Sequence, residues 1–425
     1  MEEEKTLTGK KLLVIGGAFQ HCKVVKAAHR LGAVVYVVDY LEVEQSPAKQ
    51  IADASFKIDI FDIDALTELC IREKIDGVIS CALDPCQRPY QQLCERLGLP
   101  CFGTKEQFFQ LTDKNAFKKC CLEHGVDVIP SYTEEDILAG NVQYPILIKP
   151  SDSRGSRGQS VCRSREEAIP AIDFAKRESS NSEVVIEKYM GGKQDFSMTC
   201  LMINGKAYLT RTGNRFLGAV QEGLDKVCIA CVSPSVFTGM YAEKAWERVV
   251  RMLKDIGLST APVFMQGFVD GDTVRFYDPG LRFSGGEYEE MYEFATGFNP
   301  VLPLVEFALT GKVSGDCSGM ENAVTLNGKL AVDLLVALRP GKVAAIKGVE
   351  EIRRHPAFVT MFSKIAVGQT VSPTHNVKQR FCEIDLVTDT KEEMRRAITW
   401  IYHTLRVEDE HGENMVTSRL DVNLI

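Results

Sequence analysis

The chain has no excess of positive charge, no apolar run of membrane length and no secretion signal at its start. Its 425 residues include 58 acidic and 50 basic side chains, a formal charge of −8. Because nucleic acid attracts basic surfaces, this acidic net charge predicts no nucleic-acid partner. A local basic patch is the alternative that net charge alone does not exclude. The acidic segment Met1–Lys5 lacks the basic and apolar regions of a signal peptide. We therefore predict a cytoplasmic protein that contacts no membrane.

Paired cysteine motifs are also scarce, although the chain has 14 cysteines. Only Cys228 and Cys231 have CxxC spacing, and no second pair or histidine cluster lies near them in sequence. Six others lie in apolar helix or strand patterns: Cys22, Cys70, Cys94, Cys120, Cys121 and Cys200. A reduced thiol in such a pattern behaves as a small hydrophobe. The cysteines are therefore predicted to be buried structural thiols rather than metal, redox or disulfide sites.

The sequence shows no convincing Ser/His/Asp or Cys/His arrangement, no repeat and no low-complexity stretch. A reaction that needs no covalent enzyme nucleophile fits this lack. The composition, 45% hydrophobic and 25% charged, is that of a soluble globular protein. The length is too great for one core and predicts two to four packed units.

The first hundred residues predict a parallel sheet. An aliphatic strand at 11–15 ends in Gly16-Gly17, a helical pattern follows, and a second apolar strand ends at Asp39. Continuous apolar strands of this kind are typical of a parallel sheet covered on both faces. The glycine turn and Asp39 resemble a dinucleotide fingerprint, but without the full GxGxxG a Rossmann-like sheet serving another ligand is favoured over NAD binding. His21 is expected to start a helix without binding a ligand.

A lysine and a glycine-rich loop carry the most informative chemistry. Lys149 ends an apolar strand, and the segment from Ser151 to Gly158 follows it. Backbone N–H groups of such a loop and one cation together suit a polyphosphate. The lysine precedes the glycines and the loop joins two strands, so this is not a Walker loop. Upstream, Lys114 follows the helix cap formed by Thr112 and Asp113.

The order of these motifs resembles the ATP-grasp superfamily. Lys114, then Lys149 with its loop, then Glu187-Lys188-Tyr189 and Asp195 follow that family's pattern, and the resemblance covers nearly the whole chain. It implies a fold of class α/β and α+β. A Rossmann-like pre-ATP-grasp domain would cover residues 1–104. A two-lobed ATP-grasp domain would cover 105–330, with its lid lobe at about 130–190, and a small C-terminal α+β lobe would cover 331–425.

The same resemblance implies an ATP site. Lys114 and Lys149 would hold the phosphates, Glu187 and the adjoining backbone would contact the adenine edge, and Asp195 would accept hydrogen bonds from the ribose. The implied nucleotide-binding residues are Lys114, Lys149, Ser151, Gly155, Ser156, Arg157, Gly158, Glu187, Lys188, Tyr189 and Asp195.

The resemblance also implies Mg²⁺ and a catalytic arginine. Where the family has Glu-x-Asn-x-Arg, this chain has Asp278-Pro-Gly280-Leu-Arg282, preceded by Gln266. Asp278 and Gln266 would bind the metal, and Arg282 would stabilise the charge on the transferred phosphoryl group. Gly280 has no side-chain ligand. Either one metal is held less firmly, or a carboxylate of the Glu287 segment substitutes, or the site has decayed.

Three other charged residues near these motifs are expected to be structural. Arg215 is interpreted as a surface-loop arginine, and Glu289 and Glu290 as a solvated helix start.

We therefore expect an ATP-dependent carboxylate–amine ligase, which phosphorylates a small carboxylate and joins the acyl phosphate to an amine, releasing ADP and phosphate. Segment 341–351 resembles the terminal lobe of amino-acid ligases and favours an amino-acid or peptide-type carboxylate. A bicarbonate-using carboxylase and a degenerate ATP-binding regulatory protein are the alternatives. The partners would be small molecules, and homodimers are common among such folds. All of this requires Lys114 and Lys149 to share one cleft.

Overall fold

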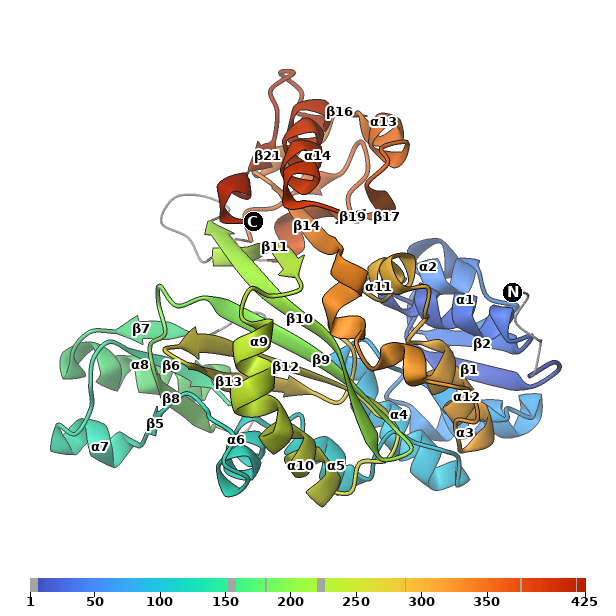
Figure 1. Cartoon of the computed structure of the whole chain (residues 1–425), viewed down its shortest axis with the longest axis horizontal. Helices are drawn as coiled ribbons and strands as arrows, with labels where there is room; N and C mark the ends of the chain where they lie inside the picture. The colour runs from blue at the N-terminus through green and yellow to red at the C-terminus, as the bar shows by residue number, and fades with distance from the viewer. Residues whose placement is uncertain are drawn as a thin grey trace.

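The computed structural model describes residues 7–151, 158–179, 182–219, 226–286, 288–374, 377–417 and 419–425. Figure 1 shows the N-terminal segment, the central segment and the C-terminal segment gathered in different parts of the molecule, with a long sheet between them. Of the helices in these ranges, none is both long and apolar enough to cross a membrane.

The N-terminal sheet is parallel, as predicted, with strand order β3-β2-β1-β4. Its buried apolar strands are packed between helices, which explains their continuous hydrophobic pattern. The strands and the helices of this region are β1 (Lys11–Ile15), β2 (Val34–Asp39), β3 (Ala54–Lys57), β4 (Gly77–Ile79), α1 (Cys22–Arg30), α2 (Pro47–Gln50), α3 (Ile63–Glu73) and α4 (Asp84–Leu97). Helix α12 (Leu302–Thr310), although much later in the chain, also packs against this sheet. The contact is so close that a Cβ on Gly77 of β4 would lie 2.2 Å from the Ala308 carbonyl oxygen.

A second, antiparallel sheet of order β5-β8-β6-β7 lies beside the central sheet (Figure 1). Helix α8 covers it, and Ile146, Ile148 and Ile186 belong to its small separate core. The elements of this region are α5 (Lys105–Gln110), α6 (Lys114–Glu123), β5 (Ser131–Tyr132), α7 (Glu134–Ala139), β6 (Ile146–Pro150), β7 (Ser160–Cys162), α8 (Arg165–Glu178) and β8 (Val184–Lys188).

Among the described residues, the central sheet is antiparallel and has nine strands, in the order β13-β12-β9-β10-β11-β14-β19-β17 with β21 paired to β14. The turn at Asn204-Gly205 joins β9 to β10, as its sequence predicts. The strands are β9 (Asp195–Ile203), β10 (Lys206–Ala219), β11 (Lys226–Ser233), β12 (Ala261–Asp270), β13 (Thr273–Gly280), β14 (Leu330–Leu338), β17 (Phe358–Ser363), β19 (Arg380–Thr388) and β21 (Val416–Thr417). Because β11 pairs with β14, one sheet continues into the C-terminal segment.

Of the remaining elements, α9 packs near β13 and α11 packs near β17 and β19, while β15 pairs with β18 and β16 with β20 in two small separate sheets. Helix α9 continues through a π-helical turn at Ala242–Trp246 into α10. The C-terminal segment has its own core around α14, with both helices and strands, as predicted. These elements are α9 (Thr238–Tyr241), α10 (Glu247–Asp255), α11 (Tyr288–Thr296), α13 (Val349–Arg353), α14 (Lys391–Thr404), β15 (Gly341–Lys342), β16 (Ala345–Lys347), β18 (Thr370–Val371) and β20 (Arg406–Glu408).

The 14 cysteines form no disulfide in the described residues, where all of them lie, and all except Cys101 and Cys228 are buried. Cys231 is buried in β11, so the CxxC pair lies in a strand as its apolar sequence predicts.

Candidate functional site

A cavity of about 310 Å³ lies where the first sheet, the central sheet and the C-terminal strands meet. The loop between β4 and α4 forms one wall, and β9 to β12 form another. The loop after β13 and strands β14 and β19 complete it. Its charged lining consists of Asp84, Arg211, Arg215, Arg282, Asp333, Arg380 and Glu383.

Two lysines enclose the buried carboxylate of Glu187. Lys149 on β6 forms an ion pair with it, with Nζ 2.6 Å from Oε2, and Lys118 on α6 forms an ion pair with Oε1. Lys149 and Glu187 share one face of the sheet because Leu147, two residues before Lys149, lies opposite Glu187. Burial opposes the ionisation of Glu187, but the two ammonium groups outweigh it and lower its pKa. Glu187 is therefore a carboxylate that fixes both lysines.

Lys149 and Lys114 reach consecutive residues of β13. The Lys149 Nζ lies 5.5 Å from the ring centre of Tyr277, and the Lys114 Nζ lies 3.7 Å from Asp278 Oδ1. Lys149 comes from the smaller sheet, and Lys114 is the first residue of α6 after its Asp113 cap. Two cations from different elements thus approach neighbouring residues of one strand, and neither lysine is among the residues that line the 310 Å³ cavity.

The buried Asp195 and the half-buried Arg215 form an ion pair beside β13. They lie directly opposite each other on β9 and β10, and Arg215 Nη1 is 2.6 Å from Asp195 Oδ2. Burial raises the pKa of Asp195, and Asp278 adds to this against the opposing effect of Arg215. Arg215 also approaches the Tyr277 hydroxyl at 3.5 Å. The expectation that Arg215 lies in a surface loop is therefore wrong, because β10 extends beyond it to Ala219.

The predicted metal ligands Gln266 and Asp278 are directly opposite each other on β12 and β13. With its amide oxygen turned towards Arg215, Gln266 accepts a hydrogen bond from Nε at 3.0 Å. Asp278 faces Lys114. In the described part of the chain, no group of three or more His, Cys, Asp and Glu side chains has the geometry to hold a metal ion. The donor set at this position is one carboxylate and one amide.

Arg282 is held by Asp84, the first residue of α4. Its Nε lies 2.5 Å from Asp84 Oδ1 and its Nη2 lies 3.0 Å from Oδ2, a bidentate pair, while Nη1 donates to the Phe283 carbonyl oxygen at 2.7 Å. A Cβ on Gly280 would lie 3.1 Å from Arg282 Cγ and 3.2 Å from its Nε. Glycine at 280 therefore leaves the space that the Arg282 side chain crosses on its way to Asp84.

The other predicted nucleotide contacts lie at the ends of β6 and β8. The backbone N–H of Ser151 donates to the Glu183 carbonyl oxygen at 3.0 Å, and Gly158 has φ +69°, a conformation that favours glycine. The N–H groups of Lys188 and Tyr189 donate to the carbonyl oxygens of Pro130 and Pro145. The predicted loop residues Gly155, Ser156 and Arg157 lie outside the described residues, as does Glu287.

His21 and Glu289 are both buried near α1. His21 lies at a helix start as expected, and its Nε2 is 3.3 Å from Ser80 Oγ. Burial lowers its pKa to about 3, so the ring is neutral at pH 7. Glu289 was expected to be solvated, which is wrong. It is buried and forms an ion pair with Lys23 at 2.6 Å.

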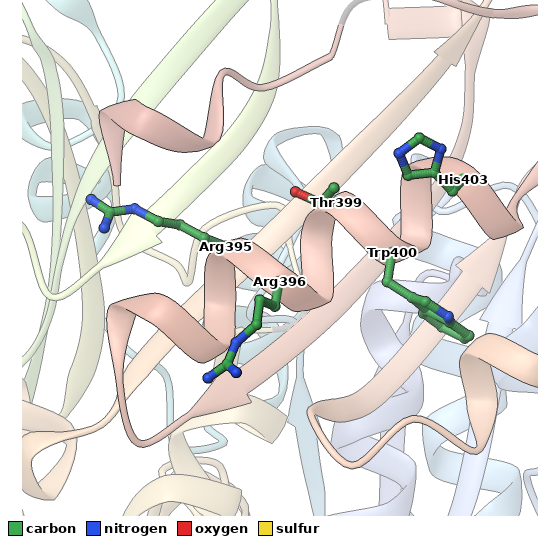
Figure 2. A pocket seen from close by; sticks show the side chains of 5 residues that line it. All are labelled: Arg395, Arg396, Thr399, Trp400 and His403. Atoms are coloured by element: carbon green, nitrogen blue, oxygen red, sulfur yellow. The ribbon is translucent and has the colours of Figure 1, made fainter.

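Sequence reasoning missed Lys118, Asp84, Arg211 and Asp333 as cavity or cluster residues. Lys118 lies one helical turn after Lys114, a spacing visible in the sequence. The others come together only through the tertiary fold. A second cavity, of about 320 Å³, lies on α14 and contains none of the predicted site residues (Figure 2); it is lined by Arg395, Arg396, Thr399, Trp400 and His403.

Two segments of the chain match family models. Residues 113–205 match the ATP-binding domain of the carbamoyl-phosphate synthase L chain, and residues 333–410 match the L-amino acid ligase C-terminal domain 2. A formate-dependent phosphoribosylglycinamide formyltransferase of Corynebacterium efficiens is 28% identical over 208 residues, 46% of this chain and 50% of that protein. The chain spans about half the length of the curated relatives that it matches.

Solved structures share the overall fold at low sequence identity. The L-amino acid ligase of Bacillus licheniformis has a TM-score of 0.78 at 16% identity, covering 95% of this chain and 99% of that one. The biotin carboxylase domain of Hydrogenobacter thermophilus 2-oxoglutarate carboxylase, solved with MgADP and bicarbonate, has a TM-score of 0.74 at 17% identity, covering 96% and 92%. These likenesses confirm the predicted fold class.

Proposed function

We propose that this chain, which has the ATP-grasp fold, is an ATP-dependent carboxylate–amine ligase. It transfers the γ-phosphate of ATP to a small carboxylate, and an amine then displaces phosphate from the acyl phosphate. The observation that carries the proposal is the approach of Lys114 and Lys149 to consecutive residues of β13, at 3.7 Å from Asp278 and 5.5 Å from the Tyr277 ring. A single triphosphate bound there would contact both ammonium groups.

The nucleotide contacts follow from this position. Lys114 and Lys149 would bind the phosphates, and Asp195 would accept hydrogen bonds from the ribose. Glu187 holds Lys149 and Lys118 in place through its two ion pairs. The segment that follows Lys149 would cover the phosphates, and the segment that starts at Glu187 would border the adenine; these residues are Ser151, Gly155, Ser156, Arg157, Gly158, Lys188 and Tyr189.

Mg²⁺ would neutralise charge on the phosphate oxygens when it is bound. One or two carboxylates together with substrate phosphates commonly hold this ion. Asp278 fits that minimum, and Gln266 adds an amide oxygen if it turns away from Arg215. Gly280 adds no ligand.

Arg282 would stabilise the transferred phosphoryl group or the substrate carboxylate. Its bidentate contact with Asp84 shows that the guanidinium already presents two N–H groups to a carboxylate at the cavity wall. A substrate carboxylate or phosphoryl group that replaces Asp84 would meet the same two donors. The cavity walls would exclude water, which would otherwise hydrolyse the acyl phosphate.

A second candidate function is ATP binding without turnover, in a regulatory protein. It is favoured by Gly280, which leaves the position of a metal ligand without a side chain, and by Gln266, which faces Arg215. A bicarbonate-using carboxylase is a third candidate, since one structure that shares the fold was solved with bicarbonate.

ADP release tests these proposals. Wild-type protein is incubated with ATP, with and without Mg²⁺, against a panel of amino acids, short carboxylic acids and bicarbonate, each with and without an amine. We expect Mg²⁺-dependent ADP release that a carboxylate stimulates. Lys149→Met should abolish it, whereas Lys206→Met, at an exposed ion-paired lysine, should not. Tight ATP binding without stimulated ADP release would support the regulatory candidate, and stimulation by bicarbonate alone would support the carboxylase.

The larger organisation is also proposed. We infer domains over 1–104, 105–330 and 331–425, a lid lobe at about 130–190, small-molecule substrates, a cytoplasmic location and a homodimer.

A further inference from the structure

Asp333 is a buried carboxylate in the cavity wall without a hydrogen-bond partner on one of its oxygens. It lies on β14, is 7% exposed and lines the 310 Å³ cavity. Within the described ranges its Oδ1 accepts no hydrogen bond. A buried carboxylate that lacks partners costs free energy, so such a group in a native fold calls for an explanation.

The charged neighbours of Asp333 have other partners. Glu383 on β19 pairs with Lys364 at 2.6 Å and with Arg380 at 3.1 Å. Arg211 on β10 donates to Ser284 Oγ and to Cys231 Sγ, each at 2.8 Å.

Asp385 lies directly opposite Asp333 on β19 and is buried, but it does not line the cavity. Asp333 is therefore an acid that faces the cavity, and the cations around it are already engaged.

The carboxylate of Asp333 lies against the loop that follows Arg282. A Cβ on Gly286 would be 2.8 Å from Asp333 Oδ2. Glycine at this position thus allows the carboxylate to approach the backbone of the loop. The same loop begins with Arg282, which binds the transferred group in the proposed ligase. Asp333 and the proposed acyl phosphate would therefore lie in one cavity.

We propose that Asp333 binds the ammonium group of the acceptor amine and takes its proton. The inference rests on the proposed ligase function and names the class of acceptor, an aliphatic amine that is protonated in solution. An ammonium group has three N–H donors and a positive charge, and Asp333 offers a negative charge and an oxygen that accepts no hydrogen bond from the described residues.

The ammonium gives one proton to the Asp333 carboxylate, which frees the nitrogen lone pair. The lone pair attacks the carbonyl carbon of the acyl phosphate, and a C–N bond forms as the C–O bond to phosphate breaks. The phosphate leaves with that electron pair and with the second N–H proton, and the product is the amide.

A pair of nucleophiles tests this role on the intact chain. Hydroxylamine is uncharged at neutral pH and converts acyl phosphates to hydroxamates, whereas ethylamine is protonated. With the carboxylate that stimulates ADP release, Asp333→Asn should raise the KM for ethylamine about 10- to 100-fold, the effect of losing one hydrogen bond to a charged group. Hydroxamate formation should change less than about threefold, because hydroxylamine brings no positive charge for Asp333 to bind and no ammonium proton for it to take.

Two further variants control for structure. Asp409→Asn makes the same change at a buried acid that pairs with Arg339 outside the cavity, and it should leave both reactions near wild-type rates. Gly286→Ala should displace the Asp333 carboxylate and weaken ethylamine use in parallel with Asp333→Asn. If Asp333→Asn loses both reactions equally, or loses neither, the proposed role is overturned. Absence of hydroxamate from every protein, wild type included, would instead contradict the ligase function.

A binding measurement keeps the inference testable without turnover. L-Alanine and L-lactate differ by an ammonium and a hydroxyl group, and calorimetry measures the affinity of each. We expect the wild type to prefer L-alanine by about tenfold or more and Asp333→Asn to lose that preference. A wild type without preference, or a variant that keeps it, would overturn the proposal.

Discussion

Replacing Asp333 by asparagine should stabilise the fold at alkaline pH. Burial raises the pKa of Asp333 from 3.8 to about 7, Glu383 adds to the shift, and Arg380, Arg211 and Lys364 oppose it. A carboxyl whose pKa is raised on folding contributes stability that is complete below about pH 4 and is lost as the pH rises through the folded-state pKa. Asparagine has no charge to bury, so the variant avoids this loss.

The size of the effect follows from the shift. One pKa unit corresponds to about 1.4 kcal/mol, so the displacement of Asp333 amounts to at most about 4 kcal/mol at pH 8.5. Part of this loss of stability is already present at pH 5, because the carboxyl of the unfolded chain is ionised there. The free energy of unfolding of Asp333→Asn, relative to wild type, should therefore increase by about 2–3 kcal/mol between pH 5 and pH 8.5.

Urea denaturation of both proteins at the two pH values measures this difference. The matched change Asp385→Asn shows how much any buried asparagine in this part of the sheet alters stability. If the difference between Asp333→Asn and wild type is the same at pH 5 and pH 8.5, the carboxyl does not titrate in this range and the reasoning is refuted. A stabilised variant with impaired use of ethylamine would show that the buried charge is kept for function.

Two further predictions concern Glu187 and Gly280. Glu187→Gln should lower the free energy of unfolding by about 3–5 kcal/mol, because it leaves two buried lysines without their carboxylate, whereas Glu321→Gln in an exposed pair should cost under about 1 kcal/mol in the same urea titration. Gly280→Asn should displace Arg282 from Asp84 and lower the melting temperature in a thermal scan, without raising Mg²⁺-dependent ADP release. A cost below about 1 kcal/mol for Glu187→Gln, or a gain of activity in Gly280→Asn, would contradict these predictions.

Local patterns in the sequence predicted much of the fold. The apolar strand at 11–15 with its glycine turn and the hairpin at Asn204-Gly205 each depend on neighbouring residues, and each forms as its sequence predicts. The pairing of β11 with β14 joins residues about 100 positions apart, so no local pattern shows it. The packing of α12 against the first sheet is of the same kind.

The candidate site shows the same limit. Lys149 could be singled out because a charged residue at the end of an apolar strand is unusual, whereas Glu187 was singled out only by its place in the family's order of motifs. Arg215 was assigned to a surface loop, yet strand pairing with β9 holds it opposite Asp195. Whether a polar residue is buried depends on distant elements, which is why Glu289 was assigned to solvent and is in fact packed against α1.

The most direct test of the central claim compares the binding of ATP and of adenosine to the wild type, Lys114→Met and Lys149→Met by calorimetry. If both lysines bind one triphosphate, each variant loses about 10- to 100-fold in affinity for ATP and keeps its affinity for adenosine. Unchanged ATP affinity in either variant, or an equal loss for adenosine, would contradict the claim.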